Sequence, residues 1–180
     1  NHEFVPSNFC GGNLIPELRV FAVGVLSQVH QADYNMLARK DHQYKFNEKD
    51  RDGALFSCFL LSFQTNYLKL KRIYKYFPNL ESVVIGGSIL LDRWLEKSNN
   101  NVLNSHVFIQ ITAMALIISA KSLSDTSLLY MVSNSKKPNR LSWKTIFNLK
   151  AISNKDFLDL EGKFATEIDW RLVIRPCDYK

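Results

Sequence analysis

Hydrophobic residues recur at steps of three and four along the first part of this chain. This spacing places side chains on one face of an α-helix, so it predicts a first amphipathic helix over residues 14–36. Asn13 is the expected N-cap, and Pro16 is compatible with the first turn of this helix. The apolar stripe comprises Leu14, Leu18, Phe21, Val25, Val29, Ala32 and Met36.

Residues 40–53 are almost wholly polar and charged, and they predict a linker or an exposed loop. A largely aromatic stripe follows and predicts a second helix that ends at Pro78. Its members are Phe56, Phe59, Phe63, Tyr67, Leu70, Tyr74 and Phe77. Asn79 is the expected N-cap of a third helix, which contains Gly86 and Gly87. Each glycine costs about 1 kcal/mol in a helix, so we expect this pair to let a neighbouring helix approach closely.

Residues 104–123 are apolar nearly all round, and a helix without a polar face must be buried on every side. We therefore expect this segment to be the central helix. The rest of the chain predicts a short helix from about Asp125, a polar loop over residues 133–140, a segment with Trp143, Ile146 and Phe147, and a last helix from Ser153 to about Ile168. Ser153 and Asp156 resemble a capping box with the shorter acid. Because no alternating run of four or more residues stands out, the fold class is expected to be all-α, with one helix inside a ring of others.

Composition narrows the class of protein. Hydrophobic residues at 46% and charged residues at 22% are ordinary values for a globular chain. Cys10, Cys58 and Cys177 are widely spaced, which argues against a disulfide framework or a zinc knuckle and favours an intracellular setting. The longest apolar stretch has 12 residues, too few for a membrane span. Because the chain begins at Asn1 without a methionine, we expect that it is trimmed at its start.

The usual signatures of catalysis are missing from the sequence. It contains no G-x-x-x-x-G-K-[ST], G-x-G-x-x-G, H-E-x-x-H or G-x-S-x-G motif, and its four histidines are scattered. We expect no enzymatic activity, no cofactor and no metal. A catalytic cysteine paired with one of the histidines stays an open alternative.

Four stretches resemble, in order, the helix motifs of P/U-type (phosphate-pathway-like) cyclin boxes. Tyr67–Tyr76 resembles "dYlkRIxkY", Leu90–Leu95 resembles "YxDRxL", Ala115–Asp125 resembles "AxxxAxKxLxD", and Ile152–Trp170 resembles "IsxxELNxLExxFLxxidf". The resemblance covers about residues 14–176. The departures are Ile109 and Gln110 in place of a His-Arg pair, Phe157 and Leu158 in the fourth motif, a longer segment after Asp125, and no arginine-containing docking motif in the first helix.

The resemblance implies a cyclin-box fold, a five-helix domain around a buried central helix plus an additional N-terminal helix. Residues 1–53 would then be the N-terminal helix and polar linker, packing on the box, with 54–176 the single cyclin box and 177–180 a C-terminal tail. It implies a regulatory subunit, a monomer by itself in the nucleus or cytoplasm, that binds a cyclin-dependent protein kinase and activates it by positioning its αC helix.

The resemblance also assigns kinase-binding residues. Lys121 would donate to backbone carbonyls just before the kinase αC helix, and Glu161 would accept from backbone amides there. Alternatively, Lys121 would be a lysine at the end of a buried helix whose charged head simply reaches solvent. Glu161 would then be an ordinary solvated position on its helix. Asp125 would face the kinase activation segment, or would simply cap a helix. Phe164 would contact αC, or would pack in the core.

Three further residues are expected to support the box. The resemblance makes Asp92 a residue that braces the box internally, with Arg93 beside it. Alternatively, Asp92 and Arg93 are polar because they lie at an ordinary exposed helix end. Trp170 is assigned to the structure of the box, with contact to αC as a second reading.

Two other functions stay open. The net charge of +6, with Lys136, Lys137 and residues 140–150, admits a nucleic-acid-binding member of the broader cyclin fold. Against this, Lys and Arg are spread over the whole chain and no internal repeat is found. The third possibility is a helical scaffold that binds another protein and activates no kinase.

Overall fold

The computed structural model describes residues 12–38, 47–73, 77–97, 103–104, 107–124, 143–147, 149 and 152–179. Within these residues every regular element is a helix, which confirms the all-α prediction. The elements are α1 (Pro16–Ala38), α2 (Asn47–Ile73), α3 (Leu80–Lys97), α4 (Phe108–Leu123), α6 (Trp143–Ile146), α7 (Asn154–Glu167) and a 3₁₀ turn, η1 (Pro176–Tyr179). The expected short helix from Asp125 and the polar loop over 133–140 lie outside the described residues.

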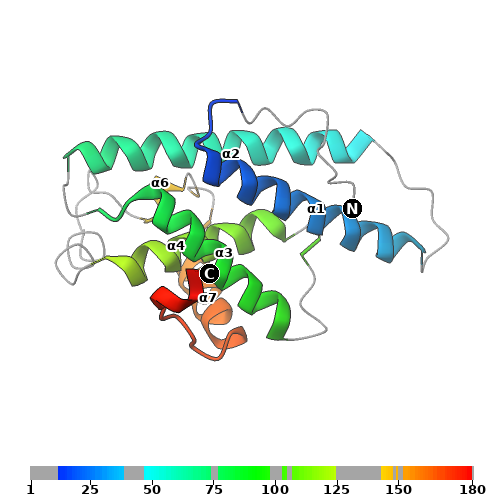
Figure 1. Ribbon diagram of the computed structural model, residues 1–180. Coiled ribbons are helices and arrows are strands. Elements are labelled where there is room, and N and C mark those ends of the chain that lie inside the picture. The colour runs from blue at the N-terminus through cyan, green and yellow to red at the C-terminus, as the bar shows by residue number, and fades with distance from the viewer. Residues whose placement is uncertain are drawn as a thin grey trace.

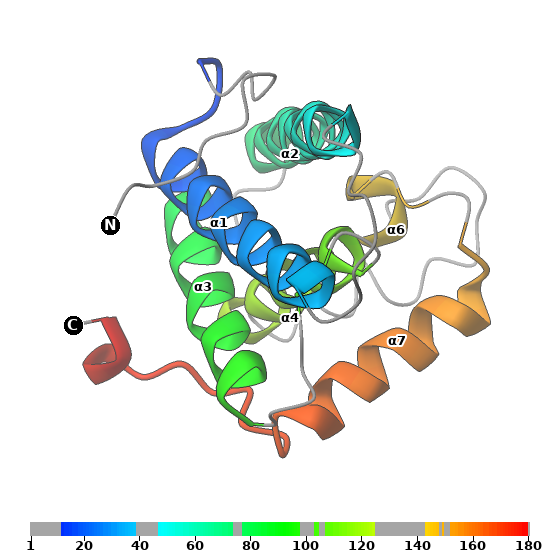
Figure 2. The same ribbon diagram turned by 90° about the vertical axis from the view of Figure 1, so that its right-hand side faces the viewer.

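Helix α4 is the centre of the fold, as its sequence predicted. Every residue from Thr112 to Ala120 is buried, and α2, α3, α6 and α7 are arranged around this helix (Figure 2). The helix begins at Phe108 instead of residue 104. Such a helix is stable only because its neighbours cover all of its sides.

Helix α1 lies across α3 and beside α2 (Figures 1 and 2). It buries four residues of the predicted stripe, namely Leu18, Phe21, Val25 and Val29, and a fifth, Leu14, is buried just before the helix begins. The backbone amide of Arg19 donates to the carbonyl of Ile15 at 3.0 Å, so Ile15 holds the N-cap position that Asn13 was expected to hold. The Gln64 side chain of α2 fixes this start, because it accepts from the Ile15 amide and donates to the Asn13 carbonyl, both at 2.8 Å.

Helix α2 begins at Asn47, so the prediction of a linker or loop is wrong for residues 47–53. The expected domain boundary between residues 53 and 54 therefore falls inside a helix. The aromatic stripe of α2 is largely buried, and Phe63 stacks on Phe147 with ring centroids 4.3 Å apart. The helix ends at Ile73, and the buried Tyr67 hydroxyl donates to the Pro78 carbonyl at 2.7 Å.

Helices α3 and α4 meet at Gly86 and Gly87. A Cβ atom at Gly86 would collide with the Ser119 hydroxyl, and one at Gly87 would lie 2.8 Å from Cδ2 of Leu116. The hydroxyl of Ser119 donates to the Val83 carbonyl at 2.7 Å across the same contact. The prediction that the glycine pair admits a neighbouring helix is confirmed.

Helix α7 begins as predicted, because the Ser153 hydroxyl accepts from the Asp156 amide at 3.0 Å. After its end at Glu167 the chain turns and continues as residues 171–179, here called the C-terminal strap, which includes η1. The strap runs back toward α3 (Figure 2). One hydrophobic cluster joins buried residues of all the α-helices described, so α1 shares its core with the helices of the proposed box.

Candidate protein-binding site

Lys121 and Glu161 form an ion pair between α4 and α7. The Nζ atom of Lys121 lies 2.5 Å from Oε1 of Glu161, and the two side chains are 27% and 20% exposed. Lys121 lies in the last turn of the apolar α4, where its charged head can reach solvent while its stem stays packed. Glu161 lies one turn after the buried Phe157 and one turn before the buried Ala165, on the face of α7 that packs inward. Glu161 is therefore not an ordinary solvated helix position.

The pair lies in a groove of about 400 Å³, here called the α4–α7 groove. Its apolar lining comes from both helices and from the chain that follows α7, and comprises Ile118, Leu158, Ala165, Trp170 and Leu172. Leu158 and Trp170 are each 64% exposed. Large apolar side chains that stay in water beside a fixed ion pair are typical of surfaces that bind other proteins.

A strained turn presents Trp170 to this groove. Asp169 and Trp170 have φ angles of 56° and 58°, in the left-handed region that costs an L-residue about 1–2 kcal/mol. The Trp170 amide donates to the Ala165 carbonyl at 2.8 Å, and Lys97 forms an ion pair with Asp169. Because the surrounding contacts hold both residues in this conformation, the indole projects from a fixed point.

Arg93 anchors the C-terminal strap to α3. Its guanidinium donates to the carbonyls of Arg171 at 2.6 Å and Val173 at 3.0 Å, and to Oδ2 of Asp178 at 3.1 Å. Since Leu172 lies between two of these acceptors and lines the α4–α7 groove, Arg93 also positions one wall of that groove. Asp92, the expected brace, makes no side-chain hydrogen bond or ion pair in the part of the chain described here.

The remaining expected residues are placed as follows. Phe164 is 1% exposed and packs in the core, so it offers no surface to a partner in this structure. Trp170, which was assigned to the structure of the box with contact to αC as the alternative, is exposed and lines the groove. Asp125 lies outside the described residues.

Sequence reasoning missed Leu158, Leu172 and the anchoring role of Arg93. Leu158 carried a signal, because it is an apolar residue among charged ones at the solvent side of an amphipathic helix. The strap carried little signal, because two of the three acceptors of Arg93 are backbone carbonyls, which every residue possesses, and the third, Asp178, is 85 residues away in the sequence.

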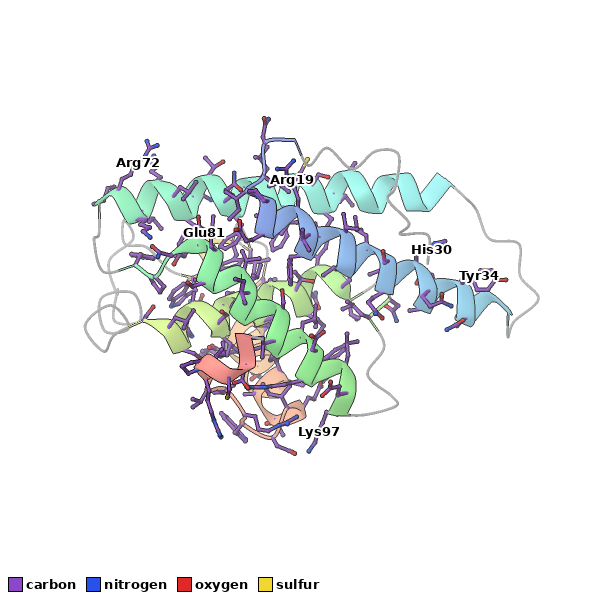
Figure 3. The ribbon with its side chains drawn as sticks, viewed as in Figure 1. Arg19, His30, Tyr34, Arg72, Glu81 and Lys97 are labelled. Carbon is purple, nitrogen blue, oxygen red and sulfur yellow. The ribbon has the colours of Figure 1, made fainter. Side chains whose placement is uncertain are left out.

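Of the basic residues that motivated the nucleic-acid alternative, the structure describes Lys144. Lys136, Lys137 and Arg140 lie outside the described residues, and Lys144 donates to Oδ1 of Asn154 at 3.1 Å. Arg72, at the end of α2, and Lys97, at the end of α3, lie at well-separated points of the molecule (Figure 3). Duplex binding would need such charges to follow one surface.

In the described residues no group of three His, Cys, Asp or Glu side chains is placed to hold a metal ion. None of the helices described is both long and apolar enough to cross a membrane. Comparisons with protein-family models, with curated proteins and with solved structures found no match to this chain.

Proposed function

We propose that this protein is a non-catalytic regulatory subunit that binds the αC helix of a cyclin-dependent protein kinase in the α4–α7 groove. The observation that carries the proposal is the Lys121–Glu161 pair at 2.5 Å in an apolar groove. These are the two residues that the resemblance to P/U-type cyclin boxes assigns to the kinase. The pairing brings them into one site from positions 40 residues apart.

The pair can bind a backbone without separating. An ammonium group has three donors and a carboxylate has about four acceptor sites, so the contact between Nζ and Oε1 uses only part of each. Lys121 can still donate to exposed carbonyls, and Glu161 can still accept from exposed amides. Because each charge already fixes the other, less side-chain entropy is lost when a partner binds.

The groove supplies apolar contact beside these polar groups. An interfacial aromatic or aliphatic anchor that becomes fully desolvated contributes about 2 kcal/mol or more, and Leu158 and Trp170 are exposed enough to serve as such anchors. Charge-assisted hydrogen bonds contribute about 1.5–3 kcal/mol each. The sum of these contributions is a binding free energy of several kcal/mol, which is the size that regulation of a partner requires.

Activation follows from preferential binding to one position of the kinase helix. Phosphoryl transfer needs the αC glutamate paired with the β3 lysine, and a subunit that binds only this inward arrangement raises its population. Shifting a population from 1:99 to 99:1 requires about 5.5 kcal/mol of differential affinity. Two charge-assisted bonds and two anchors can supply that difference.

The test is a double substitution of the pair. Lys121→Ala with Glu161→Ala should weaken binding to a co-purifying cyclin-dependent kinase by several kcal/mol, about a hundredfold or more in Kd, and leave the helical circular dichroism unchanged. Calorimetric titration gives the affinity. Kinase activity measured over the same titration reports activation.

The matched control is Lys155→Ala with Asp159→Ala, which removes one cation and one carboxylate from exposed positions of α7. This variant should bind and activate as the unmodified chain does. Equal affinity of the Lys121/Glu161 variant and the control would refute the proposal. Tight binding without any rise in kinase activity would instead support the scaffold alternative.

A further inference from the structure

A second groove, here called the α1–α3 groove, lies between the helices for which it is named, and its lining includes no residue of the α4–α7 groove. Its volume is about 690 Å³, within the range of protein sites that enclose a ligand. The apolar part of its lining includes Val20, Phe21 and Val25 from α1 and Val84, Ile85 and Leu95 from α3. Val20 is 74% exposed and Ile85 is 38% exposed, so part of this surface is in contact with water.

The charged residues that line this groove are all acidic. Glu17 of α1, Asp92 of α3 and Asp178 of the strap line it, and the lining includes no Lys, Arg or His among the described residues. The whole chain carries a net charge of +6, so this surface differs in sign from the average of the protein. Such a local reversal favours a cationic partner.

Two of these carboxylates are available to a partner. Asp178 accepts from Arg93 and from the Arg175 amide, whereas Glu17 and Asp92 make no side-chain hydrogen bond or ion pair in the part of the chain that is described. Partial burial, with Glu96 one turn further along α3 as a second cause, raises the pKa of Asp92. A cation bound beside Asp92 would offset both effects.

We propose that the α1–α3 groove binds a short segment of a partner protein in which bulky apolar side chains stand next to Lys or Arg. The apolar side chains cover Val20 and Ile85, and the cationic side chains pair with Glu17 and Asp92. This inference does not rest on the proposed kinase function, because the two grooves share no lining residue. If both proposals hold, the protein carries one surface for the kinase and another for a protein brought to it.

The test selects short peptides from a random phage-displayed library against the full chain. Enriched peptides should combine large apolar residues with Lys or Arg. Val20→Glu should weaken their binding about tenfold or more, because it removes apolar contact and places a charge in the groove. Glu17→Gln with Asp92→Asn should weaken it about threefold to tenfold and reduce its dependence on salt.

Val173→Glu is the matched control, since Val173 is also a valine, is 71% exposed and lies outside both grooves. It should leave peptide binding unchanged. Enriched peptides that bind the Val20→Glu variant as well as the control variant would overturn the proposal, and so would enrichment of acidic peptides. Loss of self-association on Val20→Glu, without any enriched peptide, would assign the groove to a second copy of the chain and equally overturn it.

Discussion

Gly86 lacks a side chain at a place where the neighbouring elements leave no room for one. A Cβ atom there would collide with the Ser119 hydroxyl and lie 2.7 Å from Cδ1 of Ile174. We predict that Gly86→Ala lowers the free energy of unfolding by about 1–3 kcal/mol, measured by urea denaturation. Overpacking and the disturbed Ser119 bond outweigh the gain of about 1 kcal/mol in helix propensity.

The control for this change is Gly24→Ala on α1, where an added Cβ would meet nothing within 4 Å. That variant should gain about 0.5–1 kcal/mol from helix propensity alone. In a chain that also carries Ser119→Ala, Gly86→Ala should lower the free energy of unfolding by less. The Ser119 hydroxyl is then gone, and Cδ1 of Ile174 is the remaining atom that a Cβ atom would meet closely. An unchanged cost would mean that Ser119 is not the obstacle.

Asp92 makes stability depend on pH. Its pKa in the folded chain is raised above the ordinary value of 3.8, so folding disfavours the ionised form. The folded state therefore binds more protons than the unfolded state between these two pKa values, and stability falls as pH rises through that interval. We predict that Asp92→Asn is more stable than the unmodified chain at pH 7 and that the advantage disappears below about pH 4, as measured by unfolding at a series of pH values.

Glu96→Gln provides the comparison for that experiment. Glu96 is the second cause of the raised pKa of Asp92. Glu96→Gln should therefore give a smaller gain in stability at pH 7 than Asp92→Asn does. If Asp92→Asn were less stable at pH 7, Asp92 would be making a favourable contact, and the expected bracing role would regain support.

Some single residues could be predicted from the sequence and others could not. The contact of Lys121 with Glu161 is in keeping with the resemblance, which assigned both residues to one partner. Phe164 and Trp170 show the limit of that reasoning, because two aromatic residues six positions apart have opposite burial. Trp170 is exposed because it follows the last turn of α7 in a left-handed conformation, which no periodicity reveals.

At the scale of elements, the apolar period predicted helices better than it predicted their ends. The interior of α4 and the stripe of α1 were predicted because burial selects apolar residues at the helical period. The start of α2 was missed because residues 47–52 are polar and charged and carry no apolar stripe, although they continue a helix that is stabilised further along. The N-terminus of α7 was predicted because a serine cap leaves a local signal.

The C-terminal strap depends on one side chain of another element, which gives a prediction at this scale. Arg93→Lys keeps the charge but loses the planar fork that reaches the Arg171 and Val173 carbonyls and Asp178 together. We expect stability to fall by about 1–3 kcal/mol and trypsin to cleave faster after Arg171, the site in the strap that is not followed by proline. Mass spectrometry of the early fragments measures the second effect.

Lys163→Ala is the control for the strap, because Lys163 is 74% exposed and its nitrogen lies 3.8 Å from Glu167. A surface pair of this kind contributes about 0–1 kcal/mol, so cleavage in the strap should not change. Equal cleavage of the Arg93→Lys variant and this control would show that the strap is held by its apolar contacts instead.

At the scale of the molecule, the resemblance suggested an N-terminal helix and linker that pack on the box, and in the structure α1 shares one hydrophobic core with the other α-helices described. Leu18 and Ala22 of α1 are fully buried, and Gln64 of α2 ties down the start of α1. Sequence patterns show which face of a helix is buried but not which helix covers it. The packing of α1 on both α2 and α3 therefore could not be predicted.

The last prediction tests whether α1 is an accessory or a part of this core. Among the described residues, a chain of residues 47–180 would lose seven buried apolar ones, namely Leu14, Leu18, Phe21, Ala22, Val25, Leu26 and Val29. Burial of large apolar side chains contributes about 1.5–3 kcal/mol each, and a whole domain is stable by only about 5–15 kcal/mol. We expect the shortened chain to melt without a cooperative transition and to bind a hydrophobic dye, as measured by calorimetry and fluorescence.

Single substitutions in the full chain show whether the packing of α1 side chains stabilises the fold, without shortening the chain. Leu18→Ala, at a fully buried position, should cost about 2–5 kcal/mol, whereas Val20→Ala on the exposed side of the same helix should cost about 0.5 kcal/mol or less. A cooperative melt of the shortened chain near the transition of the full chain would show that residues 47–180 fold alone. In that case α1 would serve chiefly as one wall of the α1–α3 groove, and its removal would abolish peptide binding without harming the fold.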